Sequence, residues 1–188
     1  MGYRISTIKN LPVIPEINLY VFVLGNYEWE GGYREIIEKN FNRLAKNLGP
    51  EAAIVVGHDG INLSNELIEC LHNRLPDYKL LKNLIRKANR SGTSLLLLGA
   101  HPKELNEKDL ILYAPLSEID MKFNELEIFF DELCRFAIDK NESFLRKFEE
   151  KNNSINDYLG AIELKPNFFG IGININFFIE KVLKKYNR

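Results

Sequence analysis

The chain has 188 residues, of which 45% are hydrophobic and 27% charged, and its formal net charge is −1. This composition is that of an ordinary globular protein, and it excludes collagen-like, disordered and disulfide-rich classes. A chain of this length can bury about 70% of the surface that its unfolded form exposes, so its fold needs no disulfide or metal.

The first half of the chain predicts two strands with a helix between them. Residues 1–16 contain two prolines and are expected to form an extended arm laid over the domain. Residues 17–24 (INLYVFVL) predict the first apolar strand, and a loop follows at residues 25–32. Apolar residues then recur at helical spacing from Tyr33 to Leu48, where Gly49-Pro50 ends the helix. Residues 52–56 (AAIVV) predict a strand buried on both faces of a sheet.

The middle of the chain predicts two more helices and two more strands. Asn62 or Ser64 is expected to cap a helix, and a further helix runs from about residue 77 to residue 89. Residues 94–98 (SLLLL) and 110–114 (LILYA) predict the third and fourth strands. Only residues 103–109 link these two strands, whereas a parallel crossover normally needs a dozen residues or more. The step is either an unusually tight crossover or antiparallel, and the sequence leaves both open.

The last part of the chain contains the clearest helical pattern. Its apolar stripe consists of Phe123, Leu126, Phe129, Phe130, Leu133, Ala137 and Ile138, and Ser143 is expected to cap a continuation. Alternating apolar residues at 162–175 predict a hairpin with one buried face. Residues 177–186 predict a closing helix.

Together these elements predict an α/β fold, a three-layer Rossmann-like sandwich with a mainly parallel sheet of four or more strands. We expect an N-terminal arm at 1–16, the Rossmann-like domain at 17–150, and a hairpin–helix appendage of the same domain at 155–188.

Several features predict a cytoplasmic protein that does not contact a membrane. Residues 1–9 lack the apolar segment of a secretion signal, and the longest apolar run, residues 19–24, is far shorter than a membrane span. Cys70 and Cys134 lie in predicted helices without a nearby second thiol, so we expect reduced, small hydrophobic side chains. The many Lys, Asn, Ile and Glu residues favour a prokaryotic source.

The candidate catalytic residues are histidines and carboxylates at predicted strand ends. The strand at 52–56 is followed by Gly57, His58 and Asp59, and the strand at 94–98 is followed closely by His101. If these strands are parallel neighbours, both imidazoles open onto the same rim of the sheet, where α/β proteins bind ligands. With Glu28, such a group can perform general acid–base chemistry or hold a metal. The simpler interpretation is that each histidine caps a loop.

Ser117 and Glu118 also follow a predicted strand and are further candidates for this rim. The loop at 25–32 contains the single tryptophan of the chain but matches no phosphate-binding glycine motif, and its two glutamates would repel phosphate. Tyr27 and Trp29 are therefore candidates for anchoring a partner or forming a stacking surface, against the simpler interpretation of loop residues.

Positive charge is concentrated in residues 73–103, which carry +6 with a single acid, while residues 104–150 carry −7. Four cations of the basic block are three or four residues apart and form one helical stripe: Lys79, Lys82, Arg86 and Arg90. Such a stripe suits an acidic protein surface or a nucleic-acid backbone. No aromatic residues interleave it, so base stacking is not indicated. The simpler interpretation is a solvated helix face.

No nucleophile elbow, P-loop, dinucleotide fingerprint, HExxH or paired CxxC occurs, so no cofactor and no metal is predicted. The sequence favours a non-catalytic binding or adaptor module that contacts a protein, a second copy of itself, or a protein–nucleic acid complex. In general character, such a domain is similar to accessory components of prokaryotic multi-protein systems, defence systems among them. The alternative is a hydrolase or transferase for a small polar substrate, with His58, Asp59, His101 and Glu28 or Glu118 as its site.

Overall fold

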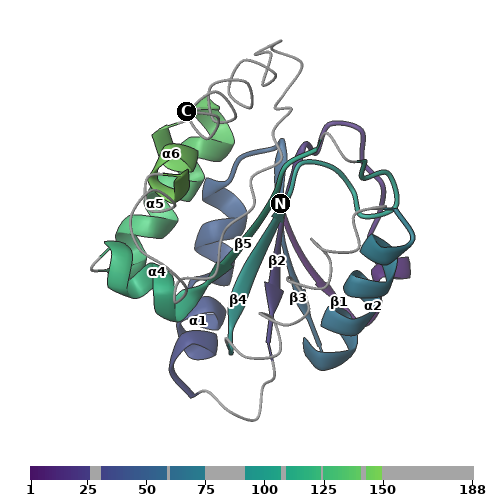
Figure 1. Cartoon of the computed structure of the whole chain (residues 1–188), viewed down its shortest axis with the longest axis horizontal. Helices are drawn as coiled ribbons and strands as arrows, with labels where there is room; N and C mark the ends of the chain where they lie inside the picture. Colours follow the sequence, from purple (N-terminus) through teal and green to yellow (C-terminus); the bar gives the residue numbers. More distant parts are fainter. Residues whose placement is uncertain are drawn as a thin grey trace, which may run out of the picture.

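Five strands form one open, mixed sheet in the computed structural model, in the order β1-β3-β2-β4-β5 (Figure 1). The structure describes residues 1–25, 31–58, 60–74, 92–106, 109–123, 125–140 and 143–149. The strands are β1 (Gly2–Ile5), β2 (Leu19–Leu24), β3 (Ala52–Gly57), β4 (Ser94–Leu98) and β5 (Ile111–Pro115). All four apolar runs that predicted strands are thus confirmed as strands, and they lie side by side.

The directions of the strands differ from the prediction. β1 and β2 each run parallel to β3, whereas β4 runs antiparallel to both β2 and β5. The prediction of a mainly parallel sheet is therefore wrong, because two of the four pairings are antiparallel, and the Rossmann-like arrangement is not confirmed. The link between β4 and β5 is of the antiparallel kind that the sequence left open, since so few residues rarely allow a parallel crossover.

β1 is a strand that the sequence analysis did not predict. It lies within the predicted arm, at the edge of the sheet, where Gly2 pairs with Ile54 and Ile5 pairs with Gly57 of β3. Of its four residues only Ile5 is buried. An edge strand with one face exposed carries no apolar run, so hydrophobicity alone does not reveal it.

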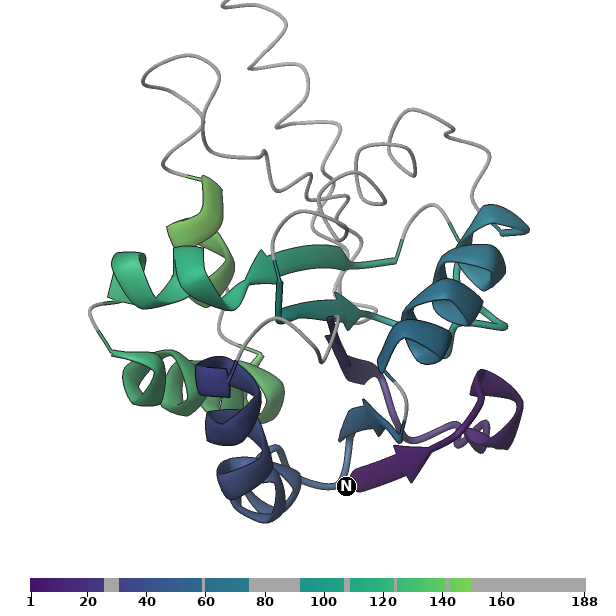
Figure 2. The same ribbon diagram turned by 90° about the horizontal axis from the view of Figure 1, so that it is seen from below.

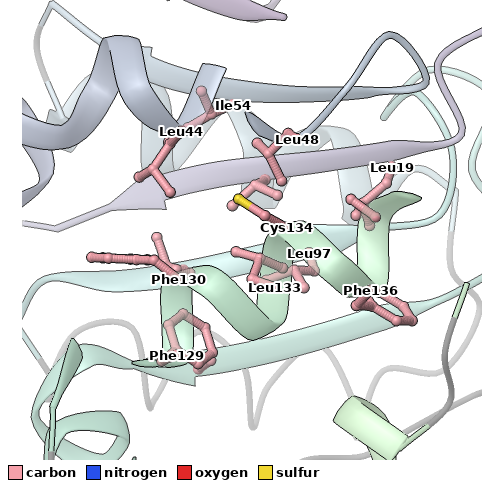
Figure 3. Packing of buried hydrophobic residues seen from close by; sticks show 14 of the residues in the cluster. Leu19, Leu44, Leu48, Ile54, Leu97, Phe129, Phe130, Leu133, Cys134 and Phe136 are labelled. Carbon is pink, nitrogen blue, oxygen red and sulfur yellow. The ribbon is translucent and has the colours of Figure 1, made fainter. Parts of the chain in front are cut away.

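Helices cover both faces of the sheet (Figure 2). On one face, Leu19, Val21 and Val23 of β2 join a core with four helices, which are α1 (Gly31–Asn47), α4 (Leu116–Phe123), α5 (Leu126–Asp139) and α6 (Ser143–Glu149). Figure 3 shows Phe129, Phe130 and Leu133 of α5 in this core. The alternation of side chains along a strand places the intervening residues of β2 on the opposite face.

The second face is covered by α2 (Gly60–His72), the short 3₁₀ helix η1 (Ile8–Asn10) and the segment that follows η1. Tyr20 and Phe22 of β2 are fully buried there. The carboxylate of Glu66 on α2 accepts hydrogen bonds from the Thr7 hydroxyl at 2.6 Å and the Ile8 amide at 2.7 Å. Glu66 therefore fixes the start of η1 to α2.

The helix predictions hold in outline and fail at several ends. α1 ends before Gly49, whose φ of +82° is a left-handed conformation that suits glycine. α2 begins at Gly60, so Asn62 and Ser64 lie inside the helix and the predicted cap is wrong. The stripe from 123 to 138 is divided between α4 and α5, and Ile138 is exposed. Phe130 is fully buried, as predicted.

Some predicted elements lie outside the described residues. These are the helix at 77–89, the hairpin at 162–175, the closing helix at 177–186 and hence the appendage at 155–188.

Candidate functional site

His58 lies at the end of the sheet where β1, β2, β3 and β5 finish. It follows the last residue of β3, its side chain is exposed, and its backbone amide donates a hydrogen bond to the Ile5 carbonyl at 2.9 Å. That hydrogen bond continues the pairing of β3 with β1. The position at a carboxyl edge is the one expected from sequence.

His101 lies at the opposite end of the sheet, because β4 is antiparallel to its neighbours. Tyr20, near the start of β2, pairs with Leu98 at the end of β4, and the His101 ring meets the Tyr20 ring edge-on at 5.5 Å between centroids. The His101 side chain is only 2% exposed. His101 is therefore a buried residue next to the beginning of β2.

The condition under which both histidines share a rim is not met. They are separated by the length of a strand, about 20 Å for six residues. The reversed β4 is the cause, since a parallel β4 would bring His101 to the same edge as His58. The two imidazoles cannot act together on one small substrate in this arrangement.

Ser117 and Glu118 are on the same end of the sheet as His58, in the first turn of α4. They follow β5, however, which is three strand spacings from β3, or about 14 Å. The hydroxyl of Tyr33 on α1 donates to Asp120 of α4 at 3.3 Å near this end. Tyr33 and Asp120 thus connect α1 with α4, whereas Ser117 and Glu118 lie too far from His58 for a shared proton transfer.

The surroundings of His101 favour a neutral imidazole. Its Nδ1 accepts a hydrogen bond from the backbone amide of Lys103 at 3.2 Å. Burial is the main cause that lowers the pKa of His101 below its ordinary value of 6.5, and the nearby Lys103 lowers it further. The backbone of Leu11 and the carboxylate of Glu104 act in the opposite direction. His101 thus caps its own turn, which is the simpler interpretation that the sequence allowed.

Neither cysteine is paired in a disulfide in the described part of the chain. Cys70 and Cys134 are both free thiols, and Cys134 is buried. Burial raises the pKa of both thiols, to about 11 for Cys134. The Cys70 thiol donates to the Pro102 carbonyl at 3.4 Å. In the described residues no three His, Cys, Asp or Glu side chains are grouped so that they could hold a metal ion.

The remaining candidate residues lie outside the described residues. They are Tyr27, Glu28, Trp29, Asp59, Lys79, Lys82, Arg86 and Arg90. Their roles stay predictions from sequence.

Tyr20 and Glu66 are important polar residues that the sequence analysis missed. Tyr20 contributes the ring against which His101 packs, and Glu66 fixes η1. The signal for Tyr20 was available, because a tyrosine within an otherwise apolar, fully buried strand brings its hydroxyl into the interior. Glu66 gave no such signal, since its partners Thr7 and Ile8 are distant in sequence.

The described part of the chain has no helix with the length and apolar character needed to cross a membrane. Comparison with known proteins provides no relative from which a role could be transferred: no family model, no curated protein and no solved structure matches this chain.

Proposed function

We propose that this protein is a non-catalytic binding or adaptor module, an accessory component of a prokaryotic multi-protein system. The observation that carries the proposal is the separation of His58 from His101 by the reversed strand β4. The alternative, a hydrolase or transferase, relied on a group of acid–base residues at one rim. His101 is buried at the opposite end of the sheet from His58. The predicted catalytic group therefore lacks one of its two histidines.

The basic stripe is the surface that we assign to the partner. In the helix predicted at 77–89, Lys79, Lys82, Arg86 and Arg90 would repel one another, at a cost of a few tenths of a kcal/mol for each pair. An anionic surface bound to the stripe would offset this repulsion, so the stripe favours an anionic binding partner.

The acidic block of the same chain is the alternative counterpart. We favour an acidic surface of another protein, or of a protein–nucleic acid complex, which the stripe would meet by charge complementarity.

Charge reversal of the stripe tests the proposal. The variant carries Lys82→Glu and Arg86→Glu, and its matched control carries Lys39→Glu and Arg43→Glu. The control changes the same residue types, four positions apart, at exposed sites on α1. Each tagged full-length chain is expressed in its source cells, cross-linked, and purified with whatever it contacts.

We expect the wild type and the control to be cross-linked to the same defined set of proteins. The stripe variant should not be cross-linked to them. Wild-type complexes should also weaken steeply as salt is raised from 50 to 200 mM, the range chosen to screen charge. Equal partner sets for the stripe variant and the control would refute the assignment. The affinity for a 20-base-pair DNA or RNA duplex is measured in parallel. If the wild type binds the duplex as strongly as it binds the cross-linked proteins, the partner of the stripe is nucleic acid rather than protein.

A further inference from the structure

The turn that follows β4 meets the N-terminal arm at a buried polar junction, which the proposed function does not use. His101 and Tyr20 are both at most 2% exposed. Neither His101 Nε2 nor the Tyr20 hydroxyl has a hydrogen-bond partner among the described residues. The backbones of Leu11 and Ile14 are close enough to His101 and Tyr20 to affect their pKa values: the first raises the pKa of His101 and the second lowers that of Tyr20, although neither makes a hydrogen bond of standard geometry. The segment 11–14 therefore covers both polar groups.

The hydrogen bond at Nδ1 fixes the protonation state of His101. Nδ1 accepts from the Lys103 amide, so its lone pair points at that N–H and the proton of the neutral ring is on Nε2. The same turn is closed by the amides of Glu104 and Leu105, which donate to the His101 carbonyl at 2.8 and 3.0 Å. The whole turn is thus built on a neutral histidine.

Protonation is incompatible with this arrangement. A proton on Nδ1 would face the Lys103 N–H, so a hydrogen bond would become a contact between two donors. The new positive charge would also be buried without a bonded carboxylate, which is costly. The turn has to open for the imidazolium to reach water.

The neighbouring groups compensate this charge only in part. The backbone of Leu11 and the carboxylate of Glu104 favour the protonated ring, whereas Lys103 adds a second cation, and the effect of burial is the largest. Tyr20 of β2 and Cys70 of α2 are held neutral, since burial raises the pKa of each. The covering segment, residues 11–14 (LPVI), has no titratable side chain.

We propose that His101 is a pH-sensitive latch: the neutral ring holds the turn 101–105 under the segment 11–14, and its protonation releases both. The direction follows from linkage. In the opened state the ring titrates near 6.5, and in the closed state it titrates lower. The stabilisation is therefore complete above pH 6.5 and is lost as the pH falls below that value.

Amide hydrogen exchange, followed by NMR on the full-length chain between pH 7.5 and 5, tests the latch. Protection factors of Glu104, Leu105 and Leu11 should fall by up to about tenfold for each pH unit below 6.5. The amide of Leu48, which bonds to Leu44 on the other face of the sheet, should keep its protection. The ring signals of His101 should titrate with the same midpoint as the loss of protection, and below 6.5.

Two variants separate the latch from a general effect of acid. His101→Asn keeps an acceptor where Nδ1 was but does not titrate, so its turn should show no acid release. His58→Asn, at the exposed histidine, should behave as the wild type. An equal acid response in His101→Asn would overturn the proposal. If that variant does not fold, the wild-type titration decides alone, and a His101 midpoint at or above 6.5, or protection that does not follow it, would also overturn it.

Discussion

Phe130 provides the sharpest test of how α5 packs on the sheet. Its side chain is 1% exposed in the core between α5, α1 and the sheet, and its ring meets that of Phe129 at 5.6 Å. Replacement by alanine removes about 2–3 kcal/mol of hydrophobic burial. It also removes an aromatic contact of about 0.5–1.5 kcal/mol and leaves a cavity. The sum agrees with the usual 3–5 kcal/mol for such a truncation.

Urea unfolding followed by far-ultraviolet circular dichroism measures this loss. With a slope of about 2–3 kcal/mol per molar for a chain of this size, the midpoint should fall by about 1–2 M. Ile128→Ala is the matched control, since Ile128 is on the same helix but 44% exposed, and it should cost less than about 1 kcal/mol. If Phe130→Ala unfolds the protein, Phe130→Leu should show a smaller loss of about 1–2 kcal/mol. Equal effects of Phe130→Ala and Ile128→Ala would show that the assigned face of α5 is wrong.

Two further predictions concern backbone conformation and thiol reactivity. Gly49→Ala should destabilise the protein by about 1–2 kcal/mol, because Gly49 has a φ of +82°. Gly32→Ala in α1, where an added Cβ meets nothing within 4 Å, should stabilise the protein by about 0.5 kcal/mol. Urea midpoints of the two variants that move in the same direction would contradict this. The side chain of Cys134 is buried and its pKa is raised to about 11. In the native state Cys134 should therefore react with a maleimide far more slowly than Cys70. In urea the two thiols should react at the same rate. Equal native rates, measured by mass spectrometry, would show that Cys134 is accessible.

The four fully buried strands could be predicted from sequence because a strand buried on both faces consists of consecutive apolar residues. The run at 94–98 matches β4 residue for residue, and the run at 110–114 differs from β5 by one position. Their directions could not be predicted, since a strand of five apolar residues reads the same whichever way it runs. The edge strand β1 was missed for the opposite reason: it buries too little to show a pattern.

The candidate site depended on those directions. His58 directly after β3 and His101 three residues after the end of β4 lie at strand ends as predicted, yet the distance between them depends on whether β4 is parallel. The apolar pattern of β4 carries no information on its direction. The short link at residues 103–109 was the one feature of the sequence that favoured an antiparallel pairing, that of β4 with β5. The link bears on the pairing of β4 with β5, while the pairing that separates the histidines is that of β4 with β2.

The central position of β2 has a consequence for the synthesis of the chain. β2 pairs with β3 on one side and with β4 on the other, and all six of its residues are buried. During translation β3 emerges well before β4, so one edge of this apolar strand stays open until β4 has left the ribosome. At 5–20 residues per second, the stretch from the end of β3 to the end of β4 takes roughly 2–8 s. For that interval the nascent chain presents an unpaired apolar edge, the kind of surface that chaperones bind and that neighbouring nascent chains can join.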